Sequence, residues 1–338
     1  MFDSLSRRPR VRLLGCFVAL LLAMTTNSVL AQNADRPATP TTGFNTDKAE
    51  VHESEVLGSA PLVGRVIIPD AKSAVLVQEN GRWFRDYRRG TQIWIAAAAV
   101  PGMIGLLLLF RLIRGRVMIE GGRGAQVILR FPAFERFMHW LTAFSWCILA
   151  ISGLNNVAGR IVLLPLLGNE NFSTLSAWLK YSHNFVAFPF MMGVVLMILV
   201  WLRHNIPHPR DIEWFAKGGG LIGHEHPPSG KFNGGQKAVF WIVVLFGTCL
   251  SLSGLAMLFP FSVTDIAGMQ LIQVIHGGLA LLMMAVMLSH IYIGSVGMEG
   301  AIDAMKTGEV DLNWARAHHD LWVEEEMKKG TIQPHAAE

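Results

Sequence analysis

The chain has 338 residues, of which 51% are hydrophobic and only 16% are charged, and its formal net charge is +4. Soluble domains carry about 25% charged residues, so this composition excludes an ordinary soluble domain and indicates a membrane protein. The small positive charge gives no indication of a nucleic-acid partner, and we expect none. Three cysteines lie in apolar runs without CxxC or CxxCH spacing, which argues against a zinc site, an iron–sulfur cluster or a covalently attached haem: Cys16, Cys147 and Cys249.

The first 31 residues have the pattern of a secretory signal. A cluster of arginines precedes the apolar run Leu13–Met24, and Val29-Leu30-Ala31 before Gln32 fits a cleavage site. A retained anchor is the alternative, but the apolar run is short for a membrane span. We therefore predict a signal peptide at 1–31, followed by a polar periplasmic segment at 32–91.

Five apolar segments predict membrane-spanning helices, since a span needs about 20 mostly apolar residues. The first, in a predicted helix at 92–114, contains Pro101-Gly102 and no histidine, so we interpret it as an anchor. Loops 111–136 and 203–237 carry most of the basic residues between spans, which places them in the cytoplasm. The prediction is a multi-pass protein of the bacterial inner membrane, with a periplasmic N-terminal segment and a cytoplasmic tail at 301–338. The five apolar segments are 93–110, 137–157, 182–202, 238–261 and 271–297.

Four histidines lie in these apolar spans, where an unpaired polar group costs several kcal/mol: His139, His183, His276 and His290. His276 and His290 are close to four helical turns apart, so both rings leave one face, about 21 Å apart. Alternating helix directions place His183 with His276 near the outer rim, and His139 with His290 near the inner rim. Each pair offers two neutral imidazoles from different helices, the ligand set of a bis-histidine haem.

Other roles for these histidines remain open. Zinc would require three or four ligands at one depth, and hydrogen bonds between helices are the alternative without a metal. For the eight histidines outside the apolar segments we expect solvated side chains.

The segment Gly230–Lys237, GKFNGGQK, leads into the fourth span near the predicted inner pair. Asn233 and Gln236 can hydrogen-bond a quinone carbonyl, and Gly234-Gly235 would leave the backbone accessible. By itself the segment is a plausible turn or helix start. Its position beside an inner haem favours a quinone site.

Six stretches, taken in order, resemble the cytochrome b556 (gamma) subunits of membrane-bound respiratory formate dehydrogenases over about residues 130–325. The resemblance implies an all-α membrane protein, with a four-helix haem-binding transmembrane bundle at 130–300 plus one additional N-terminal transmembrane helix. It implies His139, His183, His276 and His290 as axial ligands of the iron in two haem b groups. The stretches are RFMHW (136–140), YSHNF (181–185), RHNIP (203–207), GKFNGGQKAVFW (230–241), the helix of His276 and His290, and WARAHHDLW (314–322).

The resemblance also implies a menaquinone or ubiquinone site at Asn233, Gly235, Gln236 and His290. In that family a periplasmic molybdenum or tungsten subunit oxidises formate, and an iron–sulfur subunit passes electrons to the outer haem. The inner haem reduces quinone with protons from the cytoplasm. We therefore expect an electron-transfer subunit of a formate:quinone oxidoreductase, surrounded by membrane lipid and without a formate-oxidising site of its own.

Two other functions are compatible with the sequence. A cytochrome b subunit of a nickel–iron hydrogenase would have the same electron path but a different donor. A metal transporter would use the four histidines as ligands for its substrate.

Overall fold

The structure, a computed structural model, describes residues 79–119, 121–220 and 227–331. The predicted signal peptide at 1–31, residues 32–78 of the predicted periplasmic segment and the last residues of the tail lie outside this part. The chain divides into two compact units, Met1–Arg82 and Trp83–Glu338. Apart from the first residues of one helix, every element described below belongs to the second unit.

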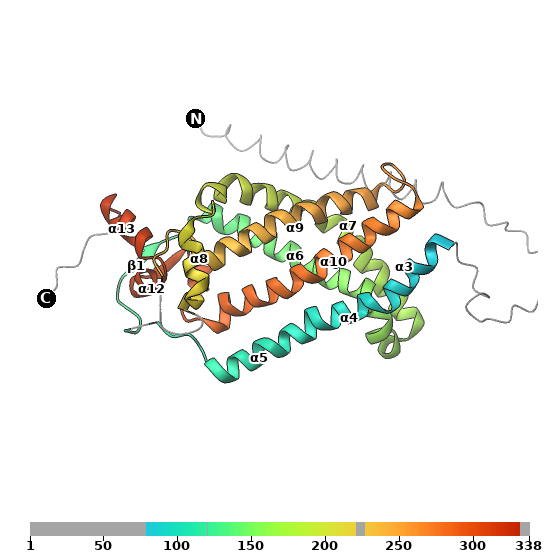
Figure 1. The fold of residues 1–338 in the computed structure, drawn as a ribbon, viewed down its shortest axis with the longest axis horizontal. Helices are drawn as coiled ribbons and strands as arrows, with labels where there is room; N and C mark the ends of the chain where they lie inside the picture. Colours follow the sequence, from blue (N-terminus) through green and yellow to red (C-terminus); the bar gives the residue numbers. More distant parts are fainter. Residues whose placement is uncertain (1–78, 120, 221–226, 332–338) are drawn as a thin grey trace, which may run out of the picture. The chain divides into compact units, whose positions relative to one another are not determined.

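Five helical stretches of the described part are long and apolar enough to cross a membrane (Figure 1). Each of them contains most or all of one predicted span, so the prediction of a helical, multi-pass integral membrane protein is confirmed. The stretches are Gly81–Arg114, Ala133–Val162, Leu164–His204, Gly234–Leu258 and Ile266–Gly297.

Four helices form the bundle that carries the histidines: α6 (Ala133–Val162), α7 (Leu164–Trp201), α9 (Gly234–Leu258) and α10 (Ile266–Tyr292). Helix α6 contacts α7, α7 contacts α9, α9 contacts α10, and α10 contacts α6, so the ring of contacts is closed. Figure 1 shows these helices running alongside one another. Because successive helices alternate in direction, the start of α6, the end of α7, the start of α9 and the end of α10 lie at one end.

The first span is a chain of short helices rather than one regular helix. It comprises α3 (Glu79–Arg89), α4 (Thr91–Ala97), a π-helical turn (Ala98–Gly102) and α5 (Met103–Arg114). Pro101 lies in the π turn, which accommodates a residue that cannot donate the regular backbone hydrogen bond. The α4 segment, the π turn and α5 all contact α10, and α5 also exposes most of its apolar side chains. This span therefore joins the bundle at one flank and presents its other face to lipid.

Helices α6 and α7 extend well beyond the apolar segments that predicted them. The sequence placed a connection at 158–181, yet α6 continues to Val162 and α7 begins at Leu164. Gly168, with φ of +74°, introduces a kink near the start of α7. Polar residues such as Asn169 and Glu170 lower the hydropathy of this stretch without preventing helix formation, so hydropathy alone missed it.

A cap of short elements covers the end of the bundle at which α6 and α9 begin (Figure 1). Strands β1 (Val127–Leu129) and β2 (Glu309–Asp311) pair antiparallel, with Ile128 opposite Val310. The sequence did not predict this pair, which ties the chain just before α6 to the tail. The other short elements are the 3₁₀ turn Leu202–His204, α8 (Pro209–Ala216), the turn Gly218–Gly220, the π turn Ile293–Gly297, α11 (Asp303–Lys306), α12 (Leu312–His318) and α13 (Asp320–Lys328).

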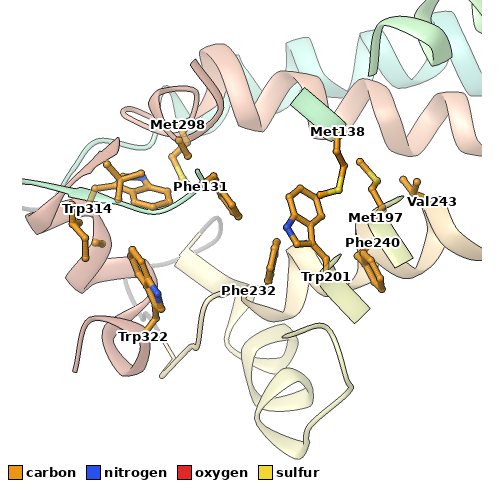
Figure 2. Packing of buried hydrophobic residues seen from close by; sticks show 14 of the residues in the cluster. Phe131, Met138, Met197, Trp201, Phe232, Phe240, Val243, Met298, Trp314 and Trp322 are labelled. Atoms are coloured by element: carbon orange, nitrogen blue, oxygen red, sulfur yellow. The ribbon is translucent and has the colours of Figure 1, made fainter. Parts of the chain in front are cut away.

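The hydrophobic core runs from the bundle into this cap. Figure 2 shows Met138 and Phe240 of the bundle, then Phe131, Trp201 and Phe232 between the bundle and the tail. These three aromatic rings have centres 5.3 to 5.7 Å apart, a favourable spacing for edge contacts. The tail joins the same cluster through buried residues that include Trp314 and Trp322.

Only one face of the last helix, α13, is solvated. Trp322 and Val323 are buried, whereas Glu324, Glu325 and Lys328 are exposed. These charged residues therefore form a solvated face, while the opposite face holds the tail against the bundle.

Candidate metal centres

Two histidines meet at the capped end of the bundle. His139 lies in the second turn of α6, and His290 lies in the last turn of α10. The centres of the two rings are 6.2 Å apart. Met138, beside His139, is fully buried, and Met287, about one turn before His290, is almost so, whereas His139 is half-buried and His290 is exposed.

The other two histidines meet toward the opposite end. His183 belongs to α7 and His276 to α10, and their ring centres are 6.3 Å apart. The structure therefore brings together the same two couples that the sequence indicated. Below, His183 and His276 are called the outer pair, and His139 and His290 the inner pair.

The spacing within each pair suits one metal between two rings. A metal lies about 2.0 Å from an imidazole nitrogen and that nitrogen about 1.1 Å from the ring centre, so two rings on opposite sides of one metal have centres about 6.2 Å apart. The observed separations are 6.2 and 6.3 Å. Space for a larger group is also present: an added Cβ at Gly294, four residues after His290, would meet nothing within 4 Å.

Serine hydroxyls determine how the outer rings are protonated. Ser152 Oγ lies 2.8 Å from His183 Nδ1, and it donates its only proton to the Ile148 carbonyl at 2.7 Å. The serine oxygen can therefore only accept from the histidine, so Nδ1 carries the proton and Nε2 keeps a free lone pair. A metal ligand needs that free nitrogen.

The same arrangement occurs at His276. Ser253 Oγ lies 2.9 Å from His276 Nδ1 and donates to the Cys249 carbonyl at 2.6 Å. Sequence reasoning missed both serines. The signal was present as Ile-Ser-Gly-Leu at 151–154 and Leu-Ser-Gly-Leu at 252–255, at equivalent depths of α6 and α9.

In the inner pair, one of the two rings has no such hydrogen bond at Nδ1 within the described residues. His139 Nδ1 is buried and has no hydrogen-bond partner within the described residues. A buried, unpartnered ring nitrogen is costly, so the inner site is less completely satisfied by the protein than the outer one.

The described residues contain no group of three or more His, Cys, Asp or Glu side chains that could hold a metal ion. Zinc sites built by proteins use three or four such ligands. The two-ligand couples therefore fit a metal whose remaining positions are filled by a macrocycle better than a bare ion.

Asn233 and Gln236 form a capping box at the start of α9. The Asn233 side-chain oxygen accepts from the Gln236 backbone N–H at 3.0 Å, and the Gln236 side-chain oxygen accepts from the Asn233 N–H at 3.2 Å. Arg130 Nη2 also donates to the Gln236 oxygen at 3.2 Å. Both amide oxygens are thus occupied, and the two NH₂ groups are left as donors.

The backbone at Gly235 is not accessible, as the sequence suggested, but is covered by a side chain of α8. An added Cβ at Gly235 would lie 2.6 Å from the indole of Trp214, and one at Gly234 would lie 3.2 Å from the same side chain. The indole of α8 therefore covers the glycine pair that the sequence suggested would be open. An added Cβ at Gly219 would also overlap this indole.

Arg130, which the sequence showed only as one basic residue of a loop, is 3% exposed. Its guanidinium lies over the rings of Phe131 and Trp314, at 5.0 and 5.1 Å from the ring centres, and donates to the Lys231 carbonyl at 2.6 Å. Burial lowers the pKa of Arg130 to about 9, while the Glu135 carboxylate opposes this shift. At neutral pH it is a buried cation within reach of Gln236.

His319 corrects the expectation that histidines outside the spans are solvated. It is fully buried, and its Nδ1 lies 2.8 Å from the Gly230 carbonyl. Burial, and secondarily the charge of Arg130, holds the pKa of His319 well below its ordinary value. His318, beside it, is only 7% exposed. Flanking tryptophans in WARAHHDLW were the available signal, because Trp314 and Trp322 anchor this stretch in the core.

A cavity of about 560 Å³ lies at the capped end, but its wall does not include Asn233, Gly235 or Gln236. Its lining is largely charged, with Arg203, Arg210 and Lys237 among the contributors. Ligand pockets for apolar molecules are lined mainly by hydrophobic side chains. A quinone site at Asn233 and Gln236 therefore does not depend on this cavity.

A bundle of four membrane helices that holds two couples of imidazoles at metal-binding distance defines the class of membrane cytochromes b. The family model described as prokaryotic cytochrome b561 matches residues 130–308. The chain belongs to this family. Its members bind haem b, so membership implies haem b for this chain, and the couples described above fit that group.

The curated relatives carry more specific names. The formate dehydrogenase cytochrome b556(fdo) subunit of Escherichia coli (strain K12) is 29% identical over 205 residues, which cover 60% of this chain and 94% of the relative. The nitrate-inducible formate dehydrogenase cytochrome b556(Fdn) subunit of the same organism is 26% identical over 207 residues, covering 60% and 92%.

The formate dehydrogenase cytochrome b556 subunit of Haemophilus influenzae (strain ATCC 51907 / DSM 11121 / KW20 / Rd) is 27% identical over 207 residues, covering 59% of this chain and 84% of the relative. These relatives confirm the resemblance seen in the sequence motifs.

Proposed function

We propose that this protein is the membrane-anchoring diheme cytochrome b subunit of a formate dehydrogenase. It would receive electrons from a periplasmic molybdenum or tungsten catalytic subunit through an iron–sulfur subunit. Two haem b groups would carry these electrons across the membrane to menaquinone or ubiquinone on the cytoplasmic side. The names of the relatives support the assignment to formate dehydrogenase, and formate chemistry would take place in the partner.

The observation that carries the proposal is the pair of ring separations, 6.3 Å in the outer pair and 6.2 Å in the inner pair. His183 and His276 would hold the outer haem, and His139 and His290 the inner haem. His276 and His290 lie on the same helix, α10, which fixes the two sites relative to each other. One helix thus supplies a ligand to both ends of the electron path.

The inner end has the donors that a quinone carbonyl requires. A carbonyl oxygen only accepts hydrogen bonds, and the free NH₂ groups of Asn233 and Gln236 only donate them. The capping box and Arg130 hold both amides in this orientation. Gly235 belongs to the same turn, where its lack of a side chain makes room for Trp214.

The orientation follows from charge. The segments 111–136 and 203–237 carry most of the basic residues between spans, and their described residues lie at the capped end. The positive-inside rule then places the inner pair, the capping box and the tail on the cytoplasmic side. In that orientation a quinone at Gln236 would take up protons from the cytoplasm, so its reduction would contribute to a proton gradient.

The experiment that tests the proposal is purification of the complex from native membranes. Reduced-minus-oxidised spectra should show b-type bands, with two haems per copy of this chain. A formate-oxidising molybdenum or tungsten subunit and an iron–sulfur subunit should copurify. Copurification of a nickel subunit instead would favour the hydrogenase alternative. Absence of haem would favour a metal transporter, for which the described residues offer no site of three or more ligands.

A further inference from the structure

The outer pair is supported by two serines in equivalent positions. Ser152 on α6 contacts His183 on the following helix, α7, and Ser253 on α9 contacts His276 on the following helix, α10. The two contacts measure 2.8 and 2.9 Å. Each serine is followed by a glycine, and the ring lies close above it: an added Cβ at Gly153 or Gly254 would be 3.7 or 3.6 Å from the Cε1 atom of the histidine.

Each serine–histidine contact belongs to a short chain of two hydrogen bonds. The hydroxyl of Ser152 donates to the Ile148 carbonyl, and the hydroxyl of Ser253 donates to the Cys249 carbonyl. A hydroxyl that donates its own proton becomes a better acceptor, because bonds in a chain polarise one another.

The inner pair offers a comparison within the same molecule. His139 Nδ1 is buried and has no partner in the described part of the chain. A ligand ring that donates from its far nitrogen is a more basic ligand than one that does not, and a more basic ligand stabilises the oxidised metal. The two ends should therefore differ in redox potential.

We propose that Ser152 and Ser253 are positioning residues that increase the basicity of both outer ligands and thereby hold the outer haem at a lower reduction potential than the inner haem. The inference rests on the proposed function, since it takes the two pairs as haem ligands. Its consequence is directional: electrons that arrive at the outer haem would move to the inner haem with a favourable free energy.

Redox titration of the purified complex, followed by the b-type absorption bands, tests this inference. In Ser152→Ala and Ser253→Ala, the lower of the two midpoints should rise and the higher should stay. We expect about a tenfold change in the reduction equilibrium for the double variant, which corresponds to about 59 mV for one electron. Haem content should be retained, because the serines contact Nδ1 of each ring and leave Nε2, the proposed ligand atom, unchanged. His276→Ala identifies which midpoint belongs to the outer haem.

Three further variants separate an effect on the reduction potential from a structural effect. Ser152→Thr and Ser253→Thr keep the hydroxyl and should restore the lower midpoint. Ser251→Ala is the matched control, since Ser251 also lies on α9 and its hydroxyl donates to the Gly247 carbonyl at 2.6 Å, away from the histidines. It should leave both midpoints unchanged.

An unchanged pair of midpoints in the double alanine variant would overturn the inference, as would a rise confined to the higher midpoint. Loss of the outer haem in the threonine variants as well as the alanine variants would also overturn it. None of these results would touch the proposed function, which fails separately if His183→Ala and His276→Ala still contain two haems.

Discussion

At the end of the bundle that holds His183 and His276, each ring lies beside a serine of the neighbouring helix, and the support is nearly symmetric. At the end that holds His139 and His290, one ring nitrogen has no partner in the described part, and a cap of aromatic and charged residues closes the bundle. The spacing of the rings is nevertheless the same within 0.1 Å.

The comparison separates two requirements. Ring spacing is what two axial ligands need, and both ends satisfy it alike. The surroundings differ because only the inner end has a second proposed task, the binding and protonation of quinone. That task requires polar groups near the bundle end, and the cap supplies them through Arg130 and Gln236.

The largest expected effect comes from removing one ligand at each end. His276→Ala should lose the outer haem and block the transfer of electrons from the iron–sulfur subunit, whereas His290→Ala should lose the inner haem and quinone reduction. Haem per polypeptide should fall by about half in each variant, because each pair is proposed to hold one group. His204→Ala, outside both pairs, is the control. Unchanged haem content in either ligand variant would disprove that assignment.

The second prediction concerns only the inner end. Gln236→Glu keeps the capping box, since Glu also serves at this position, and it gains an ion pair with Arg130. It removes the NH₂ donor and presents an acceptor to the quinone carbonyl. Binding of a quinone analogue should weaken about tenfold or more, while both haem spectra stay largely intact.

Titration of the analogue against the inner-haem spectrum measures this loss, and Gln236→Ala should show it too. Normal binding in both variants would remove Gln236 from the proposed site. Normal binding in Gln236→Glu alone would show that the side chain at this position acts through the capping box and not as an NH₂ donor to the ligand.

The four histidines could be read from the sequence because their physical setting is unusual. An imidazole in an apolar span requires a partner, and the spacing of His276 and His290 on one helix fixes their depths. Alternating helix directions then give the pairing. These arguments use only helix geometry and the cost of burial, which is why the structure brings the same rings together.

The serines that contact those rings, and the residues that form the cap, could not be predicted from the sequence in the same way. Ser152 and Ser253 look like ordinary small residues of membrane helices until the packing of α6 on α7 and of α9 on α10 is known. Arg130 belongs to a basic loop, and basic loops are normally solvated, so its burial depends on tertiary contacts with Phe131 and Trp314. The three-residue strands β1 and β2 are too short to show an alternating pattern.

The third prediction concerns a substitution at the inner end that leaves the proposed haem ligands unchanged. Gly235→Ala would place a Cβ 2.6 Å from the indole of Trp214, which also lies close to Gly219. Overpacking of this kind costs about 1–3 kcal/mol, so the variant should unfold more easily in detergent while keeping both haems.

Gly105→Ala is the matched control, because its added Cβ would meet nothing within 4 Å. Its stability should not fall, because alanine has a higher helix propensity than glycine and Gly105 lies inside α5. Equal stability of the two variants would show that Trp214 moves away freely, and the glycine would then be available to a ligand.

The smallest expected effect is a pH dependence that comes from the cap. His319 faces Arg130 and His318, and its pKa in the folded protein lies well below 6.5, first because of burial and then because of the charge of Arg130. Below pH 6.5 the unfolded chain binds a proton at this position and the folded chain does not. The unfolded state then binds more protons, so stability falls as the pH is lowered, by up to about 1.4 kcal/mol per pH unit.

Thermal unfolding at pH 7.5 and pH 5.5 measures this dependence, and His319→Gln isolates the contribution of one residue. The glutamine cannot titrate, so the variant should lose less stability than the native protein between the two pH values. Other groups titrate identically in both proteins and cancel in the difference. An equal loss in the two proteins would mean that His319 binds its proton as readily in the folded chain as in the unfolded one. The cap would then be open to water at the end of the bundle where the buried Arg130 is proposed to orient Gln236.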